Sequence, residues 1–422
     1  MKIFYGWKMV GAAALLQIMQ AMLLHQAFGA YLAVLTVEME WSKTSVSGAS
    51  ALLSAEAAIL GPVLGYFLDK FGARGVIMMG AALFGTGFIY LSQIDTLGEF
   101  YLAIGIVAVG ASMAGYFPLN VAVINWFEKK RARALSVVGL GFALGGVFVP
   151  IIAGAIQAFG WRETAMGSGL LVLLVGLPLA SLFRHRPEDY GEVVDGKNFQ
   201  AKQQRHAKQT DLAPVEANFT AKQALRTRAF WLLALGHGIA LIVVASVNTH
   251  AINHMRIALD YTIAQASYFI MLMTACQVCG VLFGGYLGDK FDKRKVASLC
   301  MLLHASAMLS LTYATGAIEL VFFAVGHGLA WGIRGPFMQA IRADYFGRRA
   351  IGMILGLSAG ITALSQSIGP LLSGALGDAT GNYRVAFTVL SIIALFGSLV
   401  FWLAKRPQDP NIPEVPLRAA VS

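Results

Sequence analysis

Apolar runs of about 20 residues recur along the whole chain, and they constrain its fold more than any other feature. A helix of about 20 apolar residues is long enough to cross the hydrocarbon core of a bilayer. Twelve such runs are present, at about 8–35, 44–68, 75–93, 98–125, 134–158, 164–183, 229–252, 264–288, 295–315, 318–343, 351–378 and 383–404. We therefore predict an all-α membrane protein with twelve transmembrane helices.

Charged residues are few and unevenly distributed. They make up 13% of the 422 residues, whereas soluble domains contain about 25%. With the N-terminus in the cytoplasm, 27 of the 32 Lys and Arg residues fall on the cytoplasmic side, and the outer loops hold only Lys43, Arg162, Arg256 and Arg384. This bias predicts that both termini are cytoplasmic. It also accounts for the net charge of +10 without a nucleic-acid partner.

One long polar stretch, residues 184–228, divides six apolar runs from six and carries nine basic and six acidic residues. We predict an N-terminal six-helix bundle (1–183), a partly disordered cytoplasmic linker (184–228), a C-terminal six-helix bundle (229–404) and a cytoplasmic tail (405–422). The first apolar run lacks a convincing cleavage site, so we expect no cleavable signal peptide.

The two bundles carry the same landmarks. The segment 65–71, Gly-Tyr-Phe-Leu-Asp-Lys-Phe, recurs 220 positions later as Gly-Tyr-Leu-Gly-Asp-Lys-Phe at 285–291, and Pro118 matches Pro336 at an offset of 218. A steady offset indicates an internal duplication, which is typical of secondary transporters. We expect the two helices that contain these prolines to share a local break.

Glycines recur every four residues in several predicted spans, including Gly61 and Gly65 in the second span and Gly352 and Gly356 in the eleventh. Small residues at this spacing let helix backbones approach closely in a membrane. We predict that these helices make tight contacts.

Polar and aromatic residues recur at helical spacing on one face of the first, fourth, seventh and tenth spans. The four stripes are Gln17, Gln20, Leu24, Phe28 and Tyr31; Ser112, Tyr116, Asn120, Val123 and Phe127; His237, Leu241, Val244 and Asn248; and His327, Trp331, Arg334 and Met338. Polar stripes that face lipid are unfavourable, so we predict that the four faces line one aqueous cavity. Separate interhelical hydrogen bonds are the alternative.

The repeated segments lie in the loops after the second and eighth spans. They continue as Asp69-Lys70-Phe71-Gly72-Ala73-Arg74 and as Asp289-Lys290-Phe291-Asp292-Lys293-Arg294. Together with twelve spans and a central linker, they resemble the major facilitator superfamily, whose signature there is roughly Gly-x-x-x-Asp-Arg/Lys-x-Gly-Arg/Lys-Arg/Lys. The two copies depart from it at Ala73 and Asp292. The resemblance implies two six-helix bundles that rock around a midplane site, without enzymatic activity.

The resemblance also implies roles for the loop residues. It places Gly65, Asp69, Arg74, Asp289 and Arg294 in loops whose ion pairs hold the inner gate closed, with solvated loop charges as the alternative. The stretches 31–48 and 126–134 look like the bacterial oxalate/formate and monocarboxylate porters, which implies a bacterial inner (plasma) membrane. Those branches usually carry an arginine in the eighth span, and oxalate porters a lysine in the eleventh. This chain has neither, so the specific substrate does not carry over.

Two charged residues lie deep inside the predicted spans, Arg334 and Glu56. Arginine presents a planar fork of donors that matches a carboxylate, so we predict that Arg334 anchors an anionic substrate, with Tyr116 opposite it in the other half. The alternative is a structural role, through an ion pair or bonds to carbonyls freed near Pro336. Burial favours the protonated form of Glu56, so we predict that Glu56 exchanges protons. The alternative is a structural ion pair or a hydrogen bond between helices.

The expected substrate site follows from these stripes. It comprises Arg334, Tyr116, Asn120, Gln20, Tyr31, His237, Asn248, His327 and Trp331. The candidates for proton coupling are Glu56, His25 and His250. We expect no catalytic residue, cofactor or metal, because Cys276 and Cys279 have metal-site spacing without a second pair.

We predict a secondary transporter that moves a small organic anion, such as a monocarboxylate, by alternating access and with possible proton coupling. It is expected to work as a monomer in the bilayer. Efflux of drug-like metabolites by proton antiport is an alternative that favours an acidic, aromatic cavity. A transport-inactive sensor is a third alternative.

Overall fold

The computed structural model describes residues 4–25, 31, 34–35, 37–41, 43–145, 148–196, 218–261 and 263–408. Within these ranges all regular structure is helical, which confirms the predicted fold class. Ten of the described segments are long and apolar enough to cross a membrane. The other two predicted spans correspond to α3 (Lys43–Phe71) and to α7 (Arg131–Gly145) followed by α8 (Val149–Phe159).

The N-terminal half contains the first six predicted spans. Besides α3, α7 and α8, its helices are α1 (Tyr5–Gln20), the π-helix η1 (Ala21–His25), α4 (Ala73–Leu91), α5 (Leu97–Ala114), α6 (Tyr116–Trp126), α9 (Trp161–Leu171), the π-helix η3 (Val172–Gly176) and α10 (Leu177–Ser181). Local sequence sets the start of α5, because Thr96 accepts a hydrogen bond from the Glu99 N–H and the Glu99 carboxylate accepts one from the Thr96 N–H. This capping box satisfies donors that the helix itself leaves free.

The C-terminal half contains the other six spans as long single helices. They are α13 (Arg228–Leu259), α14 (Ile263–Lys290), α15 (Lys293–Thr312), α16 (Ala317–Phe346), α17 (Ile351–Thr380) and α18 (Arg384–Leu403). Most helix ends lie within a few residues of the ends of the predicted apolar runs. The α13 helix continues further, from the predicted end near residue 252 to Leu259.

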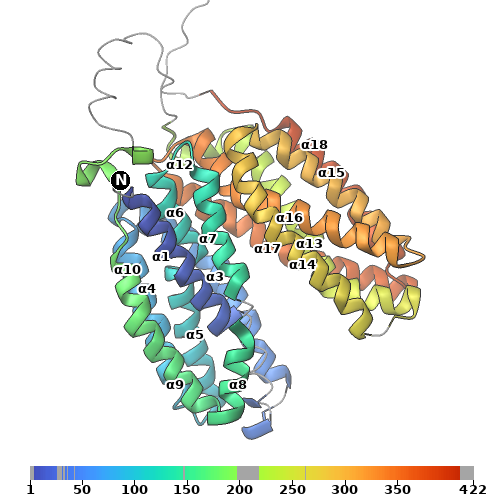
Figure 1. The fold of residues 1–422 in the computed structure, drawn as a ribbon, viewed down its shortest axis with the longest axis horizontal. Coiled ribbons are helices and arrows are strands. Elements are labelled where there is room, and N and C mark those ends of the chain that lie inside the picture. The colour runs from blue at the N-terminus through green and yellow to red at the C-terminus, as the bar shows by residue number, and fades with distance from the viewer. Residues whose placement is uncertain are drawn as a thin grey trace, which may run out of the picture.

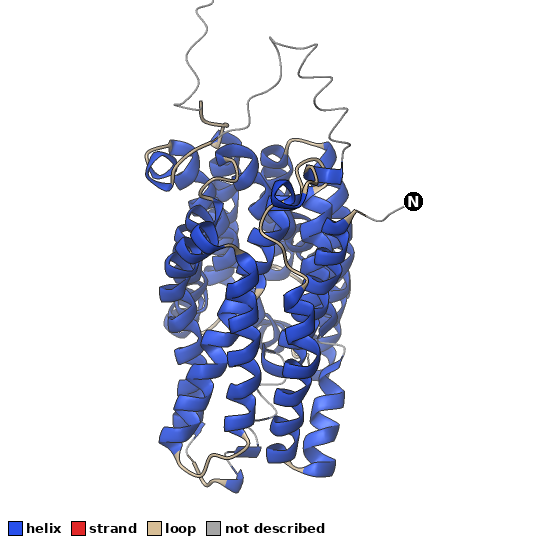
Figure 2. Ribbon diagram, turned by 90° about the vertical axis from the view of Figure 1, so that its left-hand side faces the viewer, coloured by secondary structure: helices blue, strands red, loops and turns tan. Residues whose placement is uncertain are grey.

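The two halves meet at one end of the molecule and splay apart toward the other (Figure 1). At the closed end α3 packs on α17, and α7 packs on α14 and α16. The start of α1 and the described parts of the linker lie at this same end, and the long helices run from it to the opposite end (Figure 2). The helices of the two halves therefore diverge away from the described parts of the linker.

The described parts of the linker fold against the bundles. Its first part forms the short helices η4 (Pro187–Tyr190) and η5 (Val194–Gly196), and its last part forms α12 (Ala221–Leu225). The Arg184 guanidinium lies between two rings, 3.8 Å from the centroid of Tyr5 and 4.3 Å from that of Tyr190. Residues 197–217 of the predicted linker lie outside the described residues.

The expected break is present in only one of the two duplicated helices. Residue Gly115, with φ −92° and ψ −164°, separates α5 from α6, and Pro118 follows in the first turn of α6, where no intrahelical N–H bond is lost. By contrast, α16 continues through Pro336, so the prediction of a shared break is wrong. The position that matches Gly115 is Ile333, whose backbone packs closely on Gly284 of α14.

Candidate functional site

A cavity of about 300 Å³ lies between the two halves, within the size range of small-molecule sites. The described residues that line it are Gln17, Gln20, Leu24, Glu56, Gly61, Leu64, Ala108, Ala111, Ser112, Gly115, Tyr116, Phe117, Phe142, Ala359, Thr362, Ala363 and Gln366. The N-terminal half supplies most of this wall, and α17 supplies the C-terminal part. Glu56 is the one charged residue among these lining residues.

The cavity is bounded by a tight crossing of α3 and α17. A Cβ added to Gly356 would overlap the carbonyl oxygen of Gly61, and one added to Gly65 would lie 2.5 Å from the carbonyl oxygen of Gly352. This backbone contact is the close approach that the four-residue glycine spacing predicts. We call it the α3–α17 seam, defined by Gly61, Gly65, Gly352 and Gly356.

The N-terminal wall contains hydrogen-bonded polar groups. The Gln20 side-chain amide donates to the carbonyl of Ala111 at 3.1 Å, so it is fixed beside the break in the fourth span. The Ser112 hydroxyl donates to Glu56 Oε2 at 2.9 Å. The other carboxylate oxygen, Glu56 Oε1, is buried and has no partner among the described residues. The wall therefore keeps one acceptor available for a proton or a ligand.

The stripe of α16 lies mainly in the interior of the C-terminal half. Arg334 is 1% exposed, and its Nε and Nη1 atoms have no hydrogen-bond partner in the described part of the chain. Its electrostatic neighbours include Cys300 and His304 of α15 and His237 of α13. None of these residues is among those that line the cavity. Tyr116 is among the lining residues and Arg334 is not, so the predicted pairing of the two across one cavity stays a prediction.

Two histidines of this cluster, His304 and His327, touch one another. His327 is fully buried, and its Nδ1 lies 3.2 Å from Nδ1 of His304, a residue outside the predicted site. The Nε2 atoms of both rings lack a partner in the described ranges. His237 is half-buried, with Nδ1 3.4 Å from Arg342 Nη2.

Arg342 is a third deep charge that sequence reasoning assigned to a cytoplasmic loop. It is 2% exposed, and it donates to the carbonyls of Met338 at 2.6 Å and Leu233 at 3.4 Å. It was counted on the cytoplasmic side because it lies one residue before the end of the predicted run 318–343, whereas α16 continues to Phe346. Across the described residues, no Asp or Glu forms an ion pair with Arg334 or Arg342.

The remaining predicted site residues are dispersed. Asn120 is fully buried in α6, Tyr31 is buried beside Phe88, Asn248 is exposed on α13 and Trp331 is half-buried on α16. Among the proton-coupling candidates, His250 Nε2 lies 3.0 Å from the carbonyl of Pro370. His25 ends η1, and its side chain lies outside the described set.

Two carboxylates bind helix N-termini across the closed end. Asp69 of α3 accepts hydrogen bonds from the N–H groups of Gly352 and Met353 at the start of α17, both at 2.8 Å. Asp289 of α14 accepts one from the N–H of Ala132 at the start of α7, at 2.9 Å. Free N–H groups and the helix dipole favour an anion at these positions. The duplicated acids therefore each join the two halves.

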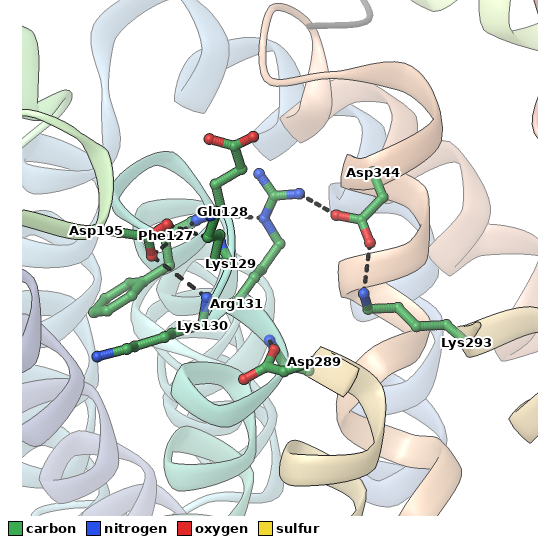
Figure 3. A network of polar contacts seen from close by, with 10 residues as sticks. Phe127, Glu128, Lys129, Lys130, Arg131, Asp195, Asp289, Lys293 and Asp344 are labelled. Carbon is green, nitrogen blue, oxygen red and sulfur yellow. Dashed lines mark hydrogen bonds and ion pairs between the residues drawn. The ribbon is translucent and has the colours of Figure 1, made fainter. Parts of the chain in front are cut away.

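The second of these contacts belongs to a larger ionic network (Figure 3). Arg133 pairs with Asp289 at 3.1 Å, and Asp344 binds both Arg131 at 2.5 Å and Lys293 at 2.7 Å. Arg131 and Asp344 belong to different halves, so this network also holds the closed end together.

The linker also contributes contacts at the closed end, beginning with Asp195 of η5. Its carboxylate accepts hydrogen bonds from the N–H groups of Glu128, Lys129 and Lys130, at 3.3, 2.8 and 3.4 Å, as Figure 3 shows. Glu188 of η4 pairs with Arg348 at 3.2 Å. The linker therefore contacts both halves at the closed end.

The other two predicted gating residues have different positions. Arg294 donates to the carbonyl of Trp402 at 3.1 Å and pairs with Asp292 at 3.5 Å, all within the C-terminal half. Arg74 is exposed at the start of α4. The structure thus places the two aspartates between the halves, and these two arginines elsewhere.

The family model described as Major Facilitator Superfamily matches residues 9–255 and 233–420. Together the two matches, which overlap in α13, cover nearly the whole chain. The chain belongs to the Major Facilitator Superfamily. Proteins of this superfamily are membrane transporters and not enzymes.

Two curated superfamily relatives illustrate the sequence similarity. The hexuronate transporter of Escherichia coli (strain K12) is 24% identical over 381 residues, which cover 86% of this chain and 86% of the relative. Monocarboxylate transporter 13 of Bos taurus is 25% identical over 402 residues, which cover 93% of this chain and 88% of the relative.

Solved superfamily structures share the fold. The proton:xylose symporter XylE, bound to 6-bromo-6-deoxy-D-glucose, superposes with a TM-score of 0.73 at 14% identity and covers 94% of this chain and 95% of its own. The human organic anion transporter MFSD10 gives a TM-score of 0.69 at 13% identity, and the match covers 94% of this chain and 99% of the MFSD10 chain. At these identities the similarity establishes the fold alone.

Four polar residues of the cavity were not in the predicted substrate site: Gln17, Ser112, Thr362 and Gln366. Gln17 and Ser112 belong to stripes that the sequence revealed. Thr362 and Gln366 lie four residues apart on α17, and this spacing is the signal that could have identified them.

Proposed function

We propose that this transporter moves a small organic anion that bears a carboxylate, by alternating access and coupled to protons. The positive-inside bias supports a cytoplasmic position for the closed end. The cavity then opens to the outer side, and the structure represents an outward-facing state. Asp69, Asp289 and the network around Asp344 keep the inner side closed in that state.

The observation that carries the proposal is the unpaired guanidinium of Arg334. It is 1% exposed, and it has no acid partner among the described residues. A buried charge without a counter-ion costs several kcal/mol, so a state in which an anion approaches Arg334 is favoured. A carboxylate matches its planar fork of donors. The names of the hexuronate, monocarboxylate and organic anion transporters fit an acidic substrate.

Glu56 is the proposed proton site. Its carboxyl faces the cavity with one oxygen on Ser112 and the other unpartnered. When ionised it repels an incoming anion, and when protonated it does not. Proton binding therefore precedes anion binding, and the two move together.

Uptake into proteoliposomes tests the proposal. Initial rates are compared for a panel of mono- and dicarboxylates, with and without an inward proton gradient, in the wild type and in Arg334→Ala. We expect gradient-stimulated uptake of at least one acid and a drop of at least about 30-fold in the variant. Arg162→Ala is the control, because Arg162 pairs with Asp95 outside the cavity. Unchanged uptake of the best acid by Arg334→Ala would contradict the proposed anchor.

A second function, proton-coupled efflux of cationic or drug-like compounds, is favoured by one observation. The lining residues include a single acid, Glu56, with the aromatic residues Tyr116, Phe117 and Phe142, and no Lys or Arg among those described. Glu56→Gln separates the two functions. An anion symporter with this variant still binds its substrate but no longer needs the proton, whereas a cation exporter loses substrate binding.

A further inference from the structure

The α3–α17 seam brings polar groups from both halves to the same depth of the cavity. From Gly61, Glu56 lies five residues back along α3, which is about 7.5 Å at about 1.5 Å per residue. From Gly356, Thr362 lies six residues further along α17, or about 9 Å. The two helices run in opposite directions through the seam, so both residues lie on its cavity side at similar height. Both line the cavity.

The polar groups on the cavity side of the seam can both donate and accept hydrogen bonds. Glu56 Oε1 is an acceptor without a partner in the described chain. The Thr362 hydroxyl donates to the carbonyl of Ala359 at 2.9 Å, which leaves its oxygen free to accept. Gln366, one turn further along α17, is exposed and offers both a donor and an acceptor to the cavity. Hydroxyl groups, which donate and accept at once, suit such a set.

We propose that the polar residues on the cavity side of the α3–α17 seam, Glu56, Thr362 and Gln366, bind the hydroxyl groups of the substrate, so that the transported acid is a hydroxy acid and not an unsubstituted carboxylic acid. One hydroxyl accepts a hydrogen bond from the protonated Glu56 carboxyl and donates to Thr362, and Gln366 binds another. This inference rests on the proposed function, because it takes the substrate to be a carboxylate. It assigns specificity to α17, a helix outside the four polar stripes.

The arrangement also links binding to movement. Glu56 belongs to the N-terminal half and Thr362 and Gln366 belong to the C-terminal half, so a bound hydroxy acid bridges the two. An acid without hydroxyls lacks this bridge. Bridging stabilises a state in which the outer ends of α3 and α17 come together around the substrate.

Matched acid pairs test the inference. Initial uptake is measured in proteoliposomes for lactate against propionate and for gluconate against hexanoate, with the wild type, Thr362→Val and Gln366→Leu. Both substitutions keep the approximate size of the side chain while removing its hydrogen bonds. Ser367→Ala is the control, because Ser367 is an exposed polar residue of α17 outside the cavity lining.

We expect the wild type to take up the hydroxylated member of each pair faster. Each cavity variant should reduce that uptake about fivefold to tenfold, with little change for the unsubstituted acid, and Ser367→Ala should match the wild type. Thermal unfolding of each purified variant checks that it is folded. Carboxylate uptake without a hydroxyl preference, or a preference that survives both variants, overturns the inference alone. Absence of uptake for every acid overturns the proposed function as well.

Discussion

The fourth and tenth spans occupy matching positions in the duplicated halves, yet they place their polar groups in different environments. The fourth span is broken at Gly115, and Ser112 and Tyr116 on either side of the break line the cavity. The tenth span is the continuous helix α16, which buries Arg334 and His327 in its own half. The fourth span thus places polar groups at the cavity, whereas the tenth span buries its positive charge away from the cavity lining.

This difference shows how a duplicated fold can acquire an asymmetric function. The duplication preserves contacts that hold the halves together, since Asp69 and Asp289 each bind the start of a helix in the opposite half. It does not preserve the polar residues of the cavity helices, where Tyr116 matches Arg334 at the same offset as the prolines. Transport specificity is therefore expected to depend on residues that differ between the repeats.

The largest predicted effect concerns the two buried arginines of α16. Arg342 binds two backbone carbonyls, so Arg342→Met should lower the free energy of unfolding by about 3 kcal/mol. Arg334 has unpartnered nitrogens, so Arg334→Met should leave stability unchanged or raise it by about 1–2 kcal/mol. Thermal unfolding of the purified proteins in detergent measures both. A similar loss in the two variants would mean that Arg334 is structurally paired.

The next largest effect concerns Glu56, the acid that α3 places at the cavity. Glu56→Gln mimics the protonated side chain, so we expect substrate exchange to persist while accumulation driven by a proton gradient falls at least about tenfold. Counterflow and gradient-driven uptake are measured in the same vesicles. Ser112→Ala is the matched control, since it removes the hydrogen bond to Glu56 but keeps the titratable group. If accumulation by Glu56→Gln equals that of the wild type, Glu56 is not the coupling site.

A smaller effect is expected at the closed end. Gly356→Val places side-chain atoms against the carbonyl of Gly61, so the seam should separate and the inner side should open more often. Substrate turnover should fall several-fold, and a cysteine introduced at Ala359 should react faster with a thiol reagent from the inner side. For comparison, Gly154→Val lies where an added Cβ meets no neighbour. Equal labelling in the two variants would argue against the seam as a gate.

The smallest effect compares the duplicated aspartates. Asp289 has both Arg133 and the Ala132 N–H as partners, whereas Asp69 has two backbone N–H groups. Each neutral variant, Asp69→Asn and Asp289→Asn, keeps an acceptor oxygen and should weaken closure of the inner side by only about 0.5–1 kcal/mol. Since Arg133 is left unpaired, the second variant should show the larger change in the same labelling assay. The reverse order would indicate that the helix N-terminus of α17 is the stronger contact.

The fold could be predicted well from the sequence, because the length of an apolar run directly reflects the thickness of the bilayer. The site could be predicted only in part. A helical period identifies a polar face but not the direction in which it points, and both the cavity and the bundle interior shield polar groups from lipid. Gln20 and Tyr116 therefore lie at the cavity as expected, whereas Arg334 and His327 lie in the interior.

The most direct test of this account is the affinity of the best transported acid for the wild type and for Arg334→Ala, measured by calorimetry at a pH where Glu56 is protonated. We predict that the dissociation constant rises at least about 30-fold, with the folded protein at least as stable as the wild type. An unchanged dissociation constant in a folded Arg334→Ala variant would contradict the proposal that positive charge in the C-terminal half anchors the substrate.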